Sequence, residues 1–170
     1  AIGGSTPLTS VTMTSASGTA INGGSVMTSG SQTFNSAVTL GNNTTLQGSG
    51  ITLGSTVNGA KTLTIIDGAA TAINGAIGAS TALSSVVAIA NGGITIAGSG
   101  VATSGFQNFG SAITLGADVT LSGSGVTLGS TVNGAHALTV ADSGATTING
   151  SIGGGTPLTS VTIGSTGGTT

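Results

Sequence analysis

Short groups of apolar and polar residues alternate along almost the whole chain. In the segment 36–40, for example, Val38 and Leu40 fall on one side of an extended backbone and Thr39 falls on the other. A period of two is typical of a half-buried β-strand, and the branched side chains of Val, Ile and Thr favour strands. No segment keeps the 3.6-residue period of a helix. The pattern therefore predicts an all-β protein built from many short strands.

The strand groups are separated by small residues and by Asn-Gly steps. Asn and Gly tolerate the positive φ angles that sharp backbone corners demand. We therefore predict structural turns at Asn22, Asn58, Asn74, Asn133 and Asn149.

The sequence aligns with itself, without a gap, when it is shifted so that Ala1 falls on Ala76. The segment LGSTVNGA, for instance, occurs at 53–60 and again at 128–135. A fixed internal period is the signature of repeat architectures, in which each unit packs on its neighbours. We interpret residues 1–170 as one continuous domain, expected to be a segment of a longer array, with units at 1–75, 76–150 and, in part, 151–170.

Apolar positions exchange only with apolar ones between the units, whereas polar positions vary more freely. This is the behaviour expected of an interior that is kept while the exterior changes. The predicted structural core consists of Val38, Leu40, Leu46, Leu53, Val57, Ile65, Ile73, Ile113, Leu115, Leu121, Leu128, Val132, Val140 and Ile148.

A shorter period lies within the unit, because similar groups recur about every 25 residues: TAIN at 19–22, TTLQ at 44–47 and TAIN at 71–74. We interpret each 75-residue unit as three turns of about 25 residues, with roughly three short strands in each turn. The resulting fold is a right-handed parallel β-helix (a β-solenoid) of about seven turns. An antiparallel sandwich would not need equivalent strands at one fixed spacing.

The stretch SSVVAIA at 84–90 departs from clean alternation, since Val86, Val87 and Ile89 do not share one phase. Two structures fit this pattern. Either Val86 points inward and two apolar side chains are exposed, or a bulge shifts the phase of the strand.

Charge is almost absent, and its absence limits the classes of partner. Only Lys61, Asp67, Asp118 and Asp142 carry a formal charge. Binding to the phosphates of nucleic acids or of anionic lipids needs several Lys or Arg residues. No apolar run approaches the roughly 18–20 residues of a membrane span. We expect neither a nucleic-acid partner nor membrane insertion.

The few ionisable residues do not predict an active site. Asp67 and Asp142 are expected three turns apart, about 14 Å, which is too far for a carboxylate pair that cleaves a glycosidic bond. The separation of Asp118 and Asp142 is close to one predicted turn and could place them on adjacent turns, but their positions relative to the strands differ. His136 is the only histidine, and cysteine is absent. We predict no enzyme activity, no catalytic or metal-binding residues and no cofactor, and we assign the aspartates to corners, where they bond local backbone.

The aromatic residues are three phenylalanines. Phe34 and Phe109 are equivalent under the 75-residue shift, and filling of the core is one interpretation of both. Phe106 has no aromatic counterpart, so the segment GFQNFG at 105–110 is also a candidate exposed contact site, with Phe106 and Phe109 as its contact residues.

The repeat motifs resemble those of a known family. The chain contains NGGSVMTSGSQTF, AVTLGNNTTL with its partner AITLGADVTL, and GSTVNGAKTLTI followed by TAINGAIG. In these motifs it resembles the repeat region of the filamentous-haemagglutinin-like giant adhesins of Gram-negative bacteria, which use two-partner secretion. The resemblance covers essentially all 170 residues. It implies a right-handed β-helix, export through an outer-membrane partner and a place at the bacterial cell surface, and it carries over no catalytic residues.

The expected function is therefore that of a stalk or fibre segment of a secreted adhesin, supporting adhesion, cell–cell contact or a biofilm matrix. Its expected partners are neighbouring repeats or identical chains end to end, with lateral self-association, while the host, cell-surface or glycan target is not specified by the sequence. One alternative is a self-assembling extracellular filament. A less favoured one is an ice- or glycan-binding face that carries the outward Thr39, Thr45, Thr52 and Thr64, although no regular Thr-x-Thr register is evident.

Overall fold

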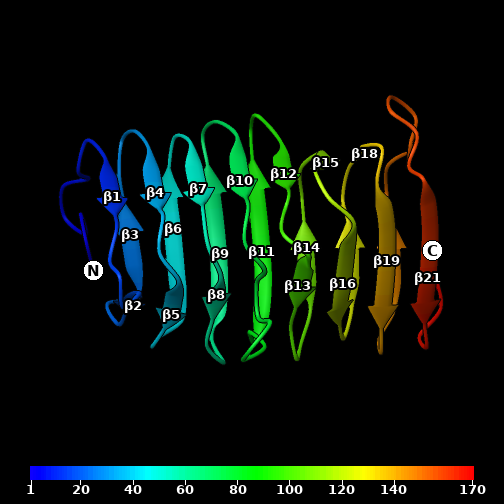
Figure 1. The fold of residues 1–170 in the computed structure, drawn as a ribbon, viewed down its shortest axis with the longest axis horizontal. Coiled ribbons are helices and arrows are strands. Elements are labelled where there is room, and N and C mark those ends of the chain that lie inside the picture. Colours follow the sequence, from blue (N-terminus) through cyan, green and yellow to red (C-terminus); the bar gives the residue numbers. More distant parts are fainter.

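The computed structural model describes residues 1–170 as an all-β rod of 21 short strands without a helix. Every strand pairing is parallel, and each strand pairs with strands one turn away rather than with its neighbour in sequence. Figure 1 shows the strands side by side along the long axis, with the termini at opposite ends of the rod. The predicted fold class, a parallel β-solenoid, is confirmed.

The coil has three faces, which we call faces I, II and III and which begin with the strands β1, β3 and β2. Face I holds β1 (Val11–Met13), β4 (Gln32–Phe34), β7 (Ile51–Leu53), β10 (Thr71–Ile73), β12 (Ile94–Ile96), β15 (Ile113–Leu115) and β18 (Val132–Asn133). Face II holds β3 (Ser25–Met27), β6 (Thr44–Gly48), β9 (Thr62–Asp67), β11 (Ser85–Ala90), β14 (Gln107–Phe109), β17 (Val126–Leu128) and β20 (Thr146–Ile148). Face III holds β2 (Thr19–Ile21), β5 (Val38–Leu40), β8 (Val57–Asn58), β13 (Gly100–Ala102), β16 (Val119–Gly123), β19 (Ala137–Asp142) and β21 (Ser160–Ser165).

Face III is continuous because Ile77 forms single bridges to Val57 and to Val101, which joins the two sheets on that face. Most turns are shorter than the predicted length of about 25 residues. The turn that starts at Val38 is already complete at Val57, and only the longest turns, such as that from Ile77 to Val101, approach the predicted length. The rod therefore contains about eight turns instead of about seven.

The 75-residue sequence repeat is not a whole number of turns. The strands β5 and β15 are equivalent under the repeat. Between them the chain moves from one face to the next eleven times, counting the Ile77 segment as one position on face III. Because three such moves complete a turn, one repeat corresponds to three and two-thirds turns. The first LGSTVNGA starts in β7 on face I, and the second starts in β17 on face II. The expectation that the second copy lies three turns along on the same face is wrong, because each unit is rotated by two-thirds of a turn relative to the one before it.

The shorter sequence period has the same origin. Thr19, Thr44 and Thr71 begin strands β2, β6 and β10, which lie on faces III, II and I. Four strand steps separate β2 from β6, and four separate β6 from β10. The period therefore corresponds to one and one-third turns, because three strands close a turn and the strands on all three faces have similar patterns.

The core is one continuous column of 30 buried apolar residues. On face II it contains the ladder Val26, Leu46, Ile65, Ala88, Phe109 and Leu128, each paired with the next one turn away. Each buried aliphatic side chain of this kind contributes roughly 1.5–3 kcal/mol relative to an exposed one. Of the fourteen residues assigned to the core from the sequence, thirteen are buried, and Ile148, near the end of the rod, is partly buried against the cluster.

The irregular stretch at 84–90 forms the regular strand β11. Residues 85–90 pair with β9 in one uninterrupted register, without a bulge. Val86 points inward, while Val87 is half-buried and Ile89 is 47% exposed on the outside. The first of the two structures that fit the sequence is therefore the one present.

Candidate functional site

The Asp67 carboxylate is buried at the end of β9, and all its contacts are to its own chain. Oδ1 accepts hydrogen bonds from the backbone N–H groups of Gly50 (2.7 Å) and Ala69 (2.9 Å). Oδ2 accepts from the Ile51 backbone N–H (2.8 Å) and from the Thr71 hydroxyl (2.8 Å). Gly50 and Ile51 lie on the preceding turn, so the carboxylate joins two turns at a corner of the coil.

Asp142 makes the same arrangement on face III. It accepts from the backbone N–H groups of Gly125 (2.6 Å), Gly144 (2.8 Å) and Val126 (2.9 Å) and from the Thr146 hydroxyl (3.0 Å). Burial raises the pKa of Asp142, but these four hydrogen bonds to the ionised form outweigh burial and hold the pKa below 3.8. Both carboxylates therefore act as structural clips, as expected for aspartates at corners.

The separation predicted for the two clips is wrong in one respect. They do not lie three turns apart along one face: Asp67 is on face II and Asp142 is on face III. The reason is the two-thirds turn by which successive units are rotated. The two carboxylates remain separated by more than three turns of the coil.

Asp118 and Asp142 do come to neighbouring strands, but not to each other. Asp118 immediately precedes β16, whereas Asp142 pairs with Gly123 at the far end of that strand. The length of extended backbone between the two levels is about 16 Å. They cannot act as a carboxylate pair on one bond.

The side chains of Asp118 and His136 lie close together at the surface, and this is the one contact between an acidic and a basic side chain in the protein. The Nδ1 atom of His136 lies 3.6 Å from Oδ1 of Asp118, and the Asp118 side chain is 77% exposed. The same Oδ1 accepts a hydrogen bond from the Ala137 backbone N–H at 2.9 Å. No group of three or more His, Cys, Asp or Glu residues is placed to hold a metal ion.

Two buried glutamines form a second kind of clip, which the sequence did not indicate. The Nε2 atom of Gln32 donates to the carbonyl oxygens of Val26 (3.0 Å) and Gln47 (2.7 Å) and contacts the Thr28 hydroxyl at 3.2 Å. Gln107, its counterpart in the second unit, repeats these contacts at 3.0, 2.8 and 3.2 Å. The Oε1 atom of each has no partner. Only the repetition of Gln at these two positions could have drawn attention to them.

The proposed aromatic contact site does not form as a pair. Phe109 is fully buried, like its counterpart Phe34, so it belongs to the core and is not a contact residue. Phe106 is 50% exposed on the outside of the corner that precedes β14. The two phenylalanines differ because Phe109 has the inward phase of the strand and Phe106 precedes it.

Two of the predicted turn asparagines hold the long loops of the coil. Oδ1 of Asn58 accepts hydrogen bonds from the backbone N–H groups of Ser80 (2.9 Å) and Thr81 (3.2 Å), and Asn133 makes the corresponding pair in the next unit. Each is followed by a glycine with positive φ, 120° at Gly59 and 126° at Gly134. The other three, Asn22, Asn74 and Asn149, directly follow the strands β2, β10 and β20.

A single-file row of threonines runs along the outside of face I. Paired positions at the centre of successive strands are Thr12, Thr33, Thr52, Ala72, Thr95, Thr114 and Asn133. Of the outward threonines considered in the sequence, Thr52 belongs to this row, Thr45 and Thr64 pair on face II, and Thr39 lies on face III. The row therefore holds at most one threonine per turn, and Ala72 and Asn133 interrupt it.

Two rows of outward side chains correspond to each other under the 75-residue repeat and differ in size at every position. On face II, four large side chains occupy successive strands and pair in register; we call Met27, Gln47, Ile66 and Ile89 the bulky row. Their counterparts under the repeat lie on face III and are small; we call Ala102, Ser122, Ala141 and Gly164 the small row. Ile66 and Ile89 are 44% and 47% exposed.

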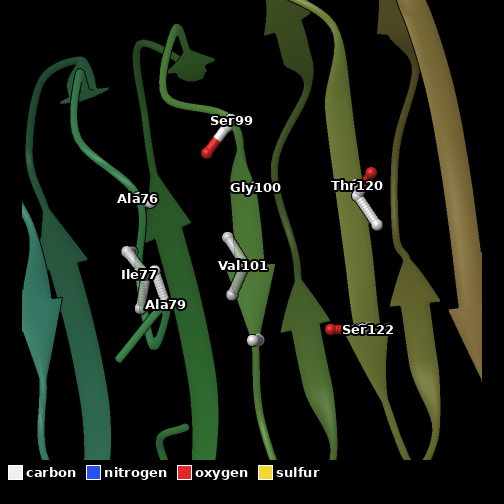
Figure 2. Close-up of a pocket in the computed structure, with 9 residues that line it drawn as sticks. Ala76, Ile77, Ala79, Ser99, Gly100, Val101, Thr120 and Ser122 are labelled. Carbon is white, nitrogen blue, oxygen red and sulfur yellow. The ribbon is translucent and has the colours of Figure 1, made fainter. Parts of the chain in front are cut away.

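A shallow hollow of about 160 Å³ opens at the start of the small row. Figure 2 shows Ile77 and Ala79 on one side of it and Thr120 and Ser122 on the strand at the other side. At the equivalent places in the first unit, Met27 stands for Ala102 and Gln47 for Ser122. The hollow therefore lies at two positions that hold small side chains here and large ones in the first unit.

Comparison with known proteins finds no matching family model, no matching curated protein and no matching solved structure. None of the structure's segments is a helix of the length and apolarity that a membrane span requires.

Proposed function

We propose that this chain is a spacer: a rigid stalk or fibre segment of a secreted bacterial surface adhesin. The observation that carries the proposal is the continuity of the coil. Parallel ladders run from the first turn to the last on three faces around one column of apolar side chains, and the same Asp and Gln clips recur in each unit. A solenoid of this kind gains length with every unit that is added.

The resemblance of the repeat motifs to those of filamentous-haemagglutinin-like adhesins supports the extracellular, cell-surface setting. The scarcity of charge is compatible with it, because a rod held together by apolar ladders is little affected by changes in salt. At about 4.8 Å per turn, the three and two-thirds turns of one unit add about 18 Å of reach.

The experiment is a length series. Arrays with one to six additional 75-residue units are placed between a membrane anchor and a binding domain of known ligand on the surface of a bacterium. Electron microscopy of the purified arrays should give rods that lengthen by about 18 Å per unit. Attachment of the cells to ligand-coated beads through a surface polysaccharide coat should rise with the number of units. Arrays that collapse or do not lengthen, or attachment independent of length at equal display, would refute the spacer role.

The threonine row on face I favours a second candidate, binding to an ordered surface such as ice or a crystalline glycan. Thr95 and Thr114 are exposed and adjacent in the row, with a spacing of about 4.8 Å. Thermal hysteresis of a millimolar solution, and its loss in a Thr95→Lys, Thr114→Lys variant, would support this function. The absence of hysteresis in the unchanged chain would remove ice from consideration, and a pull-down with insoluble glycans tests the other ligand.

A further inference from the structure

The bulky row and the small row have the same spacing between side chains, but the side chains are large in one and small in the other. Each consists of four positions on successive, register-paired strands, so both repeat at about 4.8 Å along the rod. A large side chain in one corresponds to a small one in the other at every rung, from Met27 and Ala102 at one end to Ile89 and Gly164 at the other.

The bulky row leaves apolar surface in water. Ile66 and Ile89 pair with each other across β9 and β11, and nearly half of each side chain is exposed. On the next turn Gly110 occupies the position beside Ile89, so no side chain covers Ile89 from that side. Burial of two such side chains favours association, in proportion to the area removed from water.

We infer that a second copy of this chain docks side by side with the first, with the bulky row of one copy lying over the small row of the other. A partner for either row needs side chains spaced at the same interval, and this chain presents both rows. Neither row contains a charged residue, so size and apolar surface determine the fit. This contact goes beyond the spacer role, because it makes the stalk a component of a bundle.

The positions of the two rows determine the geometry of the bundle. When both rods run in the same direction, rung-for-rung docking displaces one copy by one repeat unit, or about 18 Å along the axis. The rows lie on different faces, II and III, so each docked copy still has one free row. Because the contact joins two different surfaces, each end of an assembly keeps a free row that can bind another copy, and the assembly stays open.

A single contact of this size is weak. Four rungs span only about 14 Å from the first to the last, so the overlap is well below the roughly 800 Å² per partner of a stable interface. We expect a dissociation constant of about 0.1–1 mM for one overlap, with stronger association where many units overlap along long arrays.

The first test is sedimentation velocity with small-angle scattering at concentrations up to about 1 mM. The unchanged chain should form side-by-side assemblies, thicker and staggered. Ile66→Thr, Ile89→Thr should weaken association by at least about tenfold. The matched control is Phe106→Thr, which removes an exposed apolar side chain at the corner before β14, outside the predicted overlap, and it should associate like the unchanged chain.

The second test fills the small row. In Ala141→Ile, Gly164→Ile, large side chains would meet the bulky row, and association should again fall by at least about tenfold. Gly164 tolerates the change in the folded chain, because a Cβ there would lie 3.8 Å from its nearest neighbour, the Val140 carbonyl oxygen. When this variant is combined with Ile66→Ala, Ile89→Gly, the large and small side chains at these two rungs change places, and association should be restored. Circular dichroism verifies that each variant remains folded.

The register is tested by disulfide trapping, which is straightforward because the chain has no cysteine. A mixture of Ile89→Cys and Gly164→Cys chains should give mainly the mixed disulfide, more than a mixture of Ile89→Cys and Ala102→Cys. Three results would overturn the inference: an unchanged chain that stays monomeric at about 1 mM, association that survives both row variants, or trapping without preference for the mixed pair.

Discussion

The strands from β3 to β10 and those from β13 to β20 are two copies of one sequence unit placed on different faces of the coil. Inside the coil the copies have nearly the same geometry. The Nε2 contacts are 3.0, 3.2 and 2.7 Å at Gln32 and 3.0, 3.2 and 2.8 Å at Gln107. The carboxylate bonds lie between 2.7 and 2.9 Å at Asp67 and between 2.6 and 3.0 Å at Asp142. Outside, the first copy presents three of the four members of the bulky row and the second presents three of the four members of the small row, because Ile89 and Gly164 lie beyond the copies on β11 and β21.

This contrast shows that the three faces are interchangeable from the inside. A clip such as Asp67 needs only its own corner, the corner one turn earlier and a hydroxyl at the start of the next strand, and faces II and III both supply these. A unit can therefore be rotated by two-thirds of a turn without loss of the Gln and Asp clips. The exterior has no such requirement, and it is free to differ from face to face.

The largest expected effect tests this equivalence in the core. Phe34→Ala and Phe109→Ala each remove a fully buried aromatic side chain, and each should lower the free energy of unfolding by about 3–5 kcal/mol. If the faces are interchangeable, the two values should agree to within about 1 kcal/mol. Urea denaturation followed by circular dichroism measures both, and a much larger loss at only one site would contradict the equivalence.

The next effect tests the carboxylate clips. Asp67→Asn and Asp142→Asn keep one oxygen but turn an amide N–H₂ group toward backbone donors, which leaves buried N–H groups unpaired. We expect each variant to lose about 2–3 kcal/mol. Hydrogen exchange should speed up at Ile51 in the first variant and at Val126 in the second, because these amides donate to the carboxylates. Unchanged exchange at both amides would show that the clips do not hold the turns together.

A smaller effect follows from the pKa of Asp142. Its pKa in the folded chain lies below 3.8, so the folded state binds this proton more weakly than the unfolded state does. The stability that the carboxylate contributes is fully present above the pKa of the unfolded chain and is lost as the pH falls through the lower folded value. The free energy of unfolding should therefore be flat from about pH 7 to pH 5 and fall below about pH 4.

Comparison of acid titrations of the unchanged chain and of Asp142→Asn measures this contribution. The acid slope should be shallower in the variant, because it lacks the carboxylate. An equal slope in both chains would assign the acid sensitivity to other groups.

Much of the fold follows from the sequence, since period-two alternation reports strands and a gapless repeat reports a solenoid. The prediction of three strands per turn agrees with the structure, but the length of a turn does not follow from the sequence, because Thr19, Thr44 and Thr71 start similar strands that lie four strand steps apart on three different faces. Pairing between turns alone shows that three strands, and not the four within one sequence period, close a turn. It is a contact between residues far apart in the sequence, such as Val38 and Val57, and no single residue reports it.

The surface features were predicted less completely. Outward phase identified the threonines but left the phase of Ile89 open, and the bulky and small rows appear only when Ile66 is known to pair with Ile89 and Ala141 with Gly164. Phe106 and Phe109 are three residues apart, so strict alternation already places them in opposite phases, and their assignment to one contact site did not use this spacing.

The smallest expected effect concerns the one corner where the two units differ in charge. In the first unit Asn43 Oδ1 accepts a hydrogen bond from the Thr62 backbone N–H at 3.0 Å, and in the second Asp118 Oδ1 accepts from Ala137 at 2.9 Å. Asp118→Asn should keep this bond and lose only the exposed contact to His136, so the free energy of unfolding should change by less than about 0.5 kcal/mol. Asp118→Ala, which removes the acceptor itself, is the matched comparison and should cost about 1 kcal/mol. Equal losses in the two variants would mean that the charge, and not the hydrogen bond common to both units, holds this corner.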